Sequence, residues 1–115
     1  MMIQCKRVYE QAAPEDGYRV LVDRLWPRGV KKADLVHDEW CKALTPSDGL
    51  RKAFHSETID FAAFSRAYRE ELAQHKDEGL RLATLARQQT LTLLYAAKNT
   101  EQNHAIVLAD WLRHL

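Results

Sequence analysis

Residues 20–29 read VLVDRLWPRG, an apolar run that turns abruptly into charged, aromatic and loop-forming residues. The three consecutive apolar residues at 20–22 are typical of a strand that is covered on both faces, so we predict a central strand over residues 18–26. Pro27 ends this strand, because proline has no N–H group to donate to a neighbouring strand. The chain therefore leaves a buried strand and enters a loop that is rich in functional side chains.

A second apolar strand is predicted over residues 90–98, which read TLTLLYAAK. Two segments with helical periodicity, residues 61–76 and 79–88, lie between the two strands. Strands joined through helices pair in parallel, because the crossover returns the chain to the same end of the sheet. We therefore predict one α/β domain over residues 1–115, a small layered fold with a mainly parallel sheet flanked by helices.

Shorter segments surround the two apolar strands. The imperfect alternation over residues 3–10 predicts an edge strand, and the Pro, Asp and Gly residues within 12–17 predict a turn. Residues 38–44 are predicted to form a short extended or edge segment.

Polar residues that precede apolar helical patterns predict where the helices begin. Ser47 or Asp48 is placed to cap a short helix that runs through Phe54, and Asp60 is placed to cap the long helix. The last helix is expected to begin after Thr100, a candidate for its cap, and to run to the end of the chain.

Charge and cysteine content argue against several classes of protein. The net charge of +1 disfavours broad nucleic-acid binding, because such binding depends on neutralising many phosphates. Cys5 and Cys41 form no Cys-x-x-Cys motif, so neither a redox motif nor a zinc knuckle is indicated. No segment has the apolar length of a signal peptide or a membrane span. We expect a cytoplasmic protein that does not enter the membrane, and the sequence leaves its oligomeric state open.

Side chains suited to binding an anion follow the first buried strand. Arg24 and Arg28 can each clamp a phosphate or carboxylate, and Gly29 lets the backbone approach a ligand or adopt a positive φ. Trp26 can pack on an apolar part of the ligand, or it can be a core residue. In open parallel sheets, ligands bind beyond the carboxyl ends of the strands, which is where these residues lie.

The second buried strand ends in a matching set of residues. Tyr95 can pack on the ligand, and Lys98 can add charge at the rim. Asn103 and His104 are expected in the first turn of the last helix, whose positive end attracts anions and disfavours protonation of the imidazole. Asn103 can then orient a ligand and His104 can transfer a proton. The alternative is that both residues only hydrogen-bond the preceding loop.

No motif points to a metal or to a particular cofactor. The His-x-x-x-His spacing is absent, and so are a Walker loop, Gly-x-Gly-x-x-Gly and Gly-x-Ser-x-Gly. Cys41 has no identifiable base beside it and is expected to be a buried small hydrophobe. We therefore expect no metal site, and the cofactor remains undefined.

Four segments of the chain resemble the YeaO-like bacterial family, which is named only as a domain of unknown function. These segments are IQCKRVYE, DGYRVLVDRLWPRGVKK, LTPSDGLRKAFH and LTLLYAAKNTEQNHAIVLADWL, and they span essentially the whole chain. The resemblance implies a small cytosolic bacterial α/β domain and supplies no activity, substrate or cofactor. The residues that match the family's motif positions are Asp23, Arg24, Trp26, Pro27, Arg28, Gly29, Asn103 and His104. Cys41 lies outside that pattern, which lowers its standing as a nucleophile.

We hypothesise that the two strand ends converge on one site for a small anionic molecule, with or without acid–base catalysis by His104. Asp23 and Pro27 would support this site. The alternative is a regulatory or interaction module in which the basic loop 24–32 meets a protein or nucleic acid without catalysis. A third reading is purely structural, with Asp23, Arg24 and His104 forming a buried polar network that fixes the loops.

Overall fold

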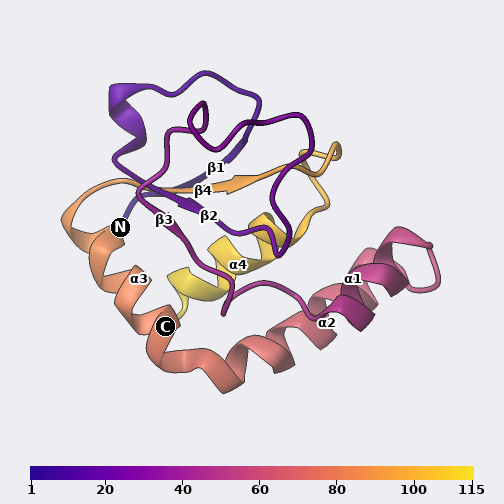
Figure 1. Cartoon of the computed structure of the whole chain (residues 1–115). Helices are drawn as coiled ribbons and strands as arrows, with labels where there is room; N and C mark the ends of the chain where they lie inside the picture. The colour runs from indigo at the N-terminus through magenta and orange to yellow at the C-terminus, as the bar shows by residue number, and fades with distance from the viewer.

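Four parallel strands form one sheet in the computed structural model, which describes all of residues 1–115. The strands are β1 (Ile3–Arg7), β2 (Tyr18–Leu21), β3 (Glu39–Trp40) and β4 (Leu91–Tyr95), and their order across the sheet is β1-β4-β2-β3 (Figure 1). All five residues of β4 are buried, as expected for a strand with a neighbour on each side. The predicted parallel α/β fold is therefore confirmed, and so are the edge positions of β1 and β3.

The helices are α1 (Asp48–His55), α2 (Phe61–Leu72), α3 (Lys76–Gln88) and α4 (His104–Arg113), with short 3-10 helices η1 (Pro14–Asp16) and η2 (Ala73–His75). The Ser47 and Asp60 side chains accept backbone N–H groups at the starts of α1 and α2, as predicted. None of the helices is long and apolar enough to cross a membrane.

Two helix boundaries differ from the prediction. Asn103, and not Thr100, caps α4, because its Oδ1 accepts the N–H of Ile106 at 3.0 Å. The long helix predicted over 61–76 divides near His75, whose φ of −122° and ψ of 35° are not helical. The sequence predicted a division between residues 76 and 79, and the structure places it a few residues earlier, because α2 ends at Leu72 and α3 begins at Lys76.

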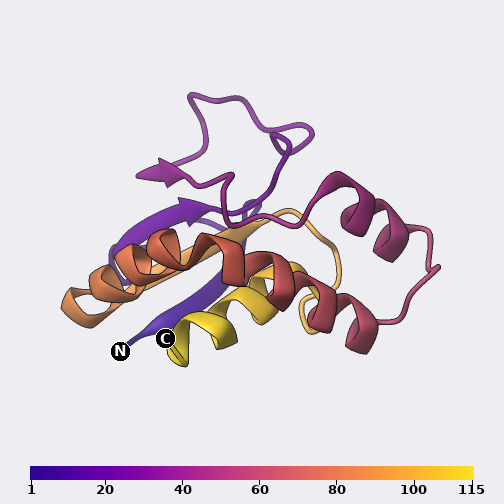
Figure 2. The same cartoon turned by 90° about the horizontal axis from the view of Figure 1, so that it is seen from below.

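The two faces of the sheet are covered differently. The helices lie on one side of the sheet, with α1 packed against α2, whereas the connections 8–17 and 22–38 cross the other face (Figure 1). Figure 2 shows α2 and α4 side by side in front of the sheet. Because side chains alternate along a strand, Val20 enters the 18-residue core under the helices and Leu21 enters a four-residue cluster under the loops.

A buried polar network replaces much of the hydrophobic core on the loop face. Asp16 accepts hydrogen bonds from Lys6 and Arg19 and from the backbone N–H of Ala13. Burial by itself raises the pKa of Asp16, but these donors outweigh burial and hold the pKa below its usual value. Gly17 follows with φ +62°, and a Cβ there would lie 2.2 Å from the carbonyl oxygen of Thr90. The network fixes the connection between β1 and β2 against the sheet.

Candidate functional site

The ends of β2 and β4 and the start of α4 meet at one edge of the sheet. The Nε2 atom of His104 lies 2.9 Å from the carbonyl oxygen of Val22 and 3.0 Å from Oδ1 of Asp23. The other oxygen of that carboxylate, Oδ2, accepts the N–H of Ala96 at 3.0 Å. The predicted convergence of the two motif segments is therefore confirmed.

Asp23 and His104 form a largely buried contact, which we call the Asp23–His104 clasp. Their side chains are only 14% and 16% exposed, which limits contact with solvent or a ligand. A carbonyl oxygen only accepts hydrogen bonds, so Nε2 of His104 must carry a proton to bond Val22. Oδ1 of Asp23 has no well-aligned hydrogen bond of its own despite the nearby imidazole. The arrangement connects two strand ends to the start of a helix.

Other residues predicted at the second strand end have structural partners. Asn103 is buried, and it both caps α4 and donates from its side-chain nitrogen to the carbonyl of Asn99 at 2.8 Å. Tyr95 is 3% exposed, and burial is the largest cause of its raised pKa. Lys98 is exposed just beyond β4. Of this group, Lys98 is the side chain that a ligand in solvent reaches most easily.

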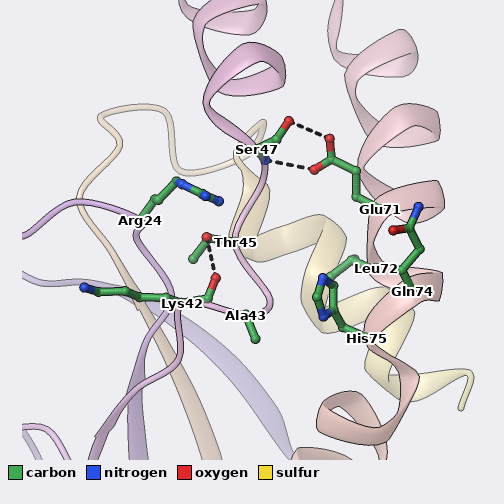
Figure 3. A pocket seen from close by; sticks show the side chains of 9 residues that line it. All are labelled: Arg24, Lys42, Ala43, Thr45, Ser47, Glu71, Leu72, Gln74 and His75. Atoms are coloured by element: carbon green, nitrogen blue, oxygen red, sulfur yellow. Dashed lines mark hydrogen bonds between the residues drawn. The ribbon is translucent and has the colours of Figure 1, made fainter.

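An open cleft of about 520 Å³ lies between the segment that follows β3 and the end of α2 (Figure 3). Arg24 borders it and points toward Thr45 and Ser47, while His75 faces it from the other wall. The backbone and stem of Lys42 line the cleft, but its ammonium lies 4.1 Å from the centre of a Trp40 ring and points away. Arg24 is therefore the permanent cation directed at this space.

The cleft contains one carboxylate, and that carboxylate is already bound. Glu71 accepts the N–H of Ser47 at 2.8 Å and its hydroxyl at 2.6 Å. Arg24 is held less firmly, with contacts of 3.4 Å to Oδ1 of Asp48 and to the carbonyl of Pro46. Its side chain is 41% exposed. The guanidinium can accordingly turn to an incoming anion at little cost.

The remaining predicted residues occupy the loop over the other face of the sheet. The indole N–H of Trp26 donates to the carbonyl of Val30 at 2.6 Å, and its ring packs edge-on against Trp40 at 5.3 Å. Gly29 has φ +75°, the positive φ for which it was singled out. Arg28 is exposed and makes no ion pair. None of these three residues lines the cleft that Arg24 borders.

One group of side chains has donors suited to a metal ion. Ligand atoms of Glu39, Cys41 and Glu78 lie within 4.8 Å of one another. However, the guanidinium of Arg81 already bridges the two carboxylates. Burial raises the pKa of the Cys41 thiol to about 11, so the thiolate that a metal needs is disfavoured. This cluster is best described as an ion-pair network.

Comparison with known proteins places the chain in a family. Residues 2–115 match the family described as the inactive DUF488-N3 subclade. The chain belongs to this subclade. It is 67% identical over 115 residues to the uncharacterised protein YeaO of Escherichia coli K12, with both chains covered completely. It is 40% identical over 111 residues to the uncharacterised protein Rv3073c of Mycobacterium tuberculosis, covering 96% of this chain and 92% of that protein. No solved structure matches.

Sequence reasoning missed most of the cleft that the structure reveals. Arg24 was singled out, but Thr45, Glu71, Gln74 and His75 were not. No local pattern marks these residues, because the cleft forms only when the end of α2 packs beside the segment that follows β3. The cap prediction at Ser47 was the one available signal, since it placed a helix start in this region.

Proposed function

We propose that this protein binds a small anionic molecule in the Arg24 cleft and does not transform it. The observation that carries the proposal is the loosely held guanidinium of Arg24 at an open cleft whose single carboxylate, Glu71, already accepts two hydrogen bonds from Ser47. An arginine in such a place gains a charge-assisted, bidentate partner when a phosphate or carboxylate enters.

Two observations support binding without chemistry. The Nε2 proton of His104 is directed at the carbonyl of Val22, so a proton transfer from this nitrogen would have to break an existing hydrogen bond. In addition, the subclade to which the chain belongs is described as inactive. Within this proposal, Asp23 and His104 position the strand end that carries Arg24, and they do not touch the ligand.

The test is a thermal-shift screen followed by calorimetry with inorganic phosphate, pyrophosphate, citrate and adenosine monophosphate. A ligand at 100 times its Kd stabilises the folded protein by about 2.7 kcal/mol, which raises Tm by several degrees in a domain of this size. We expect Arg24→Gln to weaken binding by roughly tenfold or more, because a charge-assisted hydrogen bond contributes about 1.5–3 kcal/mol.

Arg66→Gln is the matched control, because Arg66 is also an exposed arginine, but it makes no ion pair and lies on α2 away from the cleft lining. The proposal is wrong if no anion shifts Tm, or if both substitutions weaken binding equally. Arg28→Gln is tested alongside them. If only this variant loses anion binding, the anion site is in the loop over the other face of the sheet.

A further inference from the structure

The basic loop, residues 24–32, contributes only Arg24 to the cleft, and its other cations lie outside the cleft lining. It contains four cations and no carboxylate. Arg28, Lys31 and Lys32 are all exposed, and none has an acidic partner within 4.0 Å. Because the whole chain has a net charge of only +1, the remainder of the protein is net acidic. The positive charge is thus concentrated on one loop.

Hydrogen bonds hold this loop in a defined shape. The carbonyl of Arg28 accepts the hydroxyl of Tyr9 at 3.0 Å, and the carbonyl of Lys31 accepts the N–H of Asp34 at 2.9 Å. Pro27 is buried, and Trp26 bonds to the backbone within the loop. A surface that is ordered before binding loses less conformational entropy when a partner docks.

A hollow of about 430 Å³ adjoins the basic loop on the loop face of the sheet. Tyr9 and Val36 line it and are 51% and 62% exposed, respectively, so both offer apolar surface to a partner. Glu10, Asp34 and the buried Arg19 also line the hollow, so charges of both signs surround its apolar residues. Tyr9 connects the two features, because it lines the hollow and bonds to the basic loop.

We propose that the basic loop and this hollow together bind an acidic segment of a partner protein. An apolar side chain of that segment sits in the hollow against Tyr9 and Val36, and flanking Asp or Glu residues pair with Arg28, Lys31 and Lys32. Charge complementarity of this kind steers association and fixes the register of the bound segment.

A nucleic acid fits the same surface less well. Single-stranded nucleic acids gain affinity by stacking bases on aromatic rings. Here Trp26 already packs edge-on against Trp40 and His37, and Lys42 lies over Trp40, so both indoles are already partly occupied by other side chains. A long polyanion would also meet the net acidic remainder of the chain, whereas a short acidic segment need touch only the loop.

The test is fluorescence anisotropy with the full-length protein and a fluorescein-labelled peptide of four Glu-Leu-Glu repeats. Two probes of similar length serve as comparisons, a Glu-Gln-Glu peptide and a single-stranded oligothymidylate. We expect the Glu-Leu-Glu peptide to bind most tightly of the three. We expect the triple variant Arg28→Gln, Lys31→Gln, Lys32→Gln to weaken its binding at least about tenfold.

The matched control is the triple variant Lys52→Gln, Arg66→Gln, Arg87→Gln, which removes three exposed and unpaired cations from the helices. Its Kd should stay within about twofold of the unmodified protein. Val36→Ser should weaken the Glu-Leu-Glu peptide but not the Glu-Gln-Glu peptide. The proposal fails if the control triple weakens binding equally, if the oligothymidylate binds more tightly, or if no peptide binds at about 100 μM. Arg24 is unchanged throughout, so failure here leaves the cleft proposal untouched.

Discussion

Removing the carboxylate of Asp23 should destabilise the fold through the strand ends it connects. In Asp23→Ala, the N–H of Ala96 loses its acceptor at 3.0 Å, and the imidazole of His104 loses the carboxylate oxygen at 3.0 Å. A hydrogen bond to a charged group contributes about 1.5–3 kcal/mol, and the side chain is only 14% exposed, so water replaces it poorly. We expect the free energy of unfolding to fall by about 2–3 kcal/mol and Tm to fall by roughly 10 °C.

Urea unfolding followed by tryptophan fluorescence and far-UV circular dichroism measures this change, with the m-value as the check on two-state behaviour. His104→Ala and the double variant complete a double-mutant cycle, for which we expect a coupling energy of about 1 kcal/mol. The control is Asp48→Ala, because Asp48 is 58% exposed and its ion pairs should contribute less than about 1 kcal/mol. If Asp23→Ala lowers the free energy of unfolding by less than about 1 kcal/mol, or if the coupling energy is near zero, the Asp23–His104 clasp does not stabilise the fold in this way.

Three further substitutions or measurements test other parts of the structure. Asp16→Asn should cost about 3 kcal/mol at neutral pH, because it leaves a buried guanidinium unneutralised. The pKa of Asp16 is lower in the folded protein than in the unfolded chain, so the ionised carboxylate stabilises the fold above the unfolded-state pKa. This stabilisation is lost as the pH falls below about 4. The free energy of unfolding of Asp16→Asn, measured with urea, should therefore depend less on acid than that of the unmodified protein. Gly17→Ala should cost about 2–4 kcal/mol by urea unfolding, whereas Gly49→Ala, with open space around its Cβ, should not destabilise the protein. Burial raises the pKa values of the Cys5 and Cys41 thiols to about 11, so both should react slowly with a disulfide reagent at pH 7.5 until the protein unfolds. Fast labelling of the native protein would contradict that burial.

Together, the two proposals describe a scaffold that binds at two places and catalyses at neither. The Arg24 cleft lies beside the helices, and the basic loop lies on the opposite face of the sheet. The sites share the chain segment that follows β2, but only Arg24 of residues 24–32 lines the cleft. Binding assays with separate probes can therefore assign each site independently.

Much of the fold could be predicted because its signals are local. The consecutive apolar residues of β2 and β4 marked strands with neighbours, and Ser47 and Asp60 marked helix starts through hydrogen bonds that span only three residues. Boundaries were less accurate, because β2 ends at Leu21 even though the apolar pattern continues beyond it. The strand stops being paired where its neighbours diverge, and a single segment of sequence does not contain that information.

The sequence by itself determined the fold class, the parallel pairing and the meeting of the Asp23 and His104 segments, because parallel strands end at one edge of a sheet. Only the tertiary structure decided how these residues are used. It buried Tyr95 in the core, made Asn103 a helix cap, and turned Arg24 toward a cleft formed by the distant α2. The physical reason is that strand direction and amphipathic periodicity depend on residues that are close together in the sequence. The accessibility of a side chain depends instead on which remote segments pack against it.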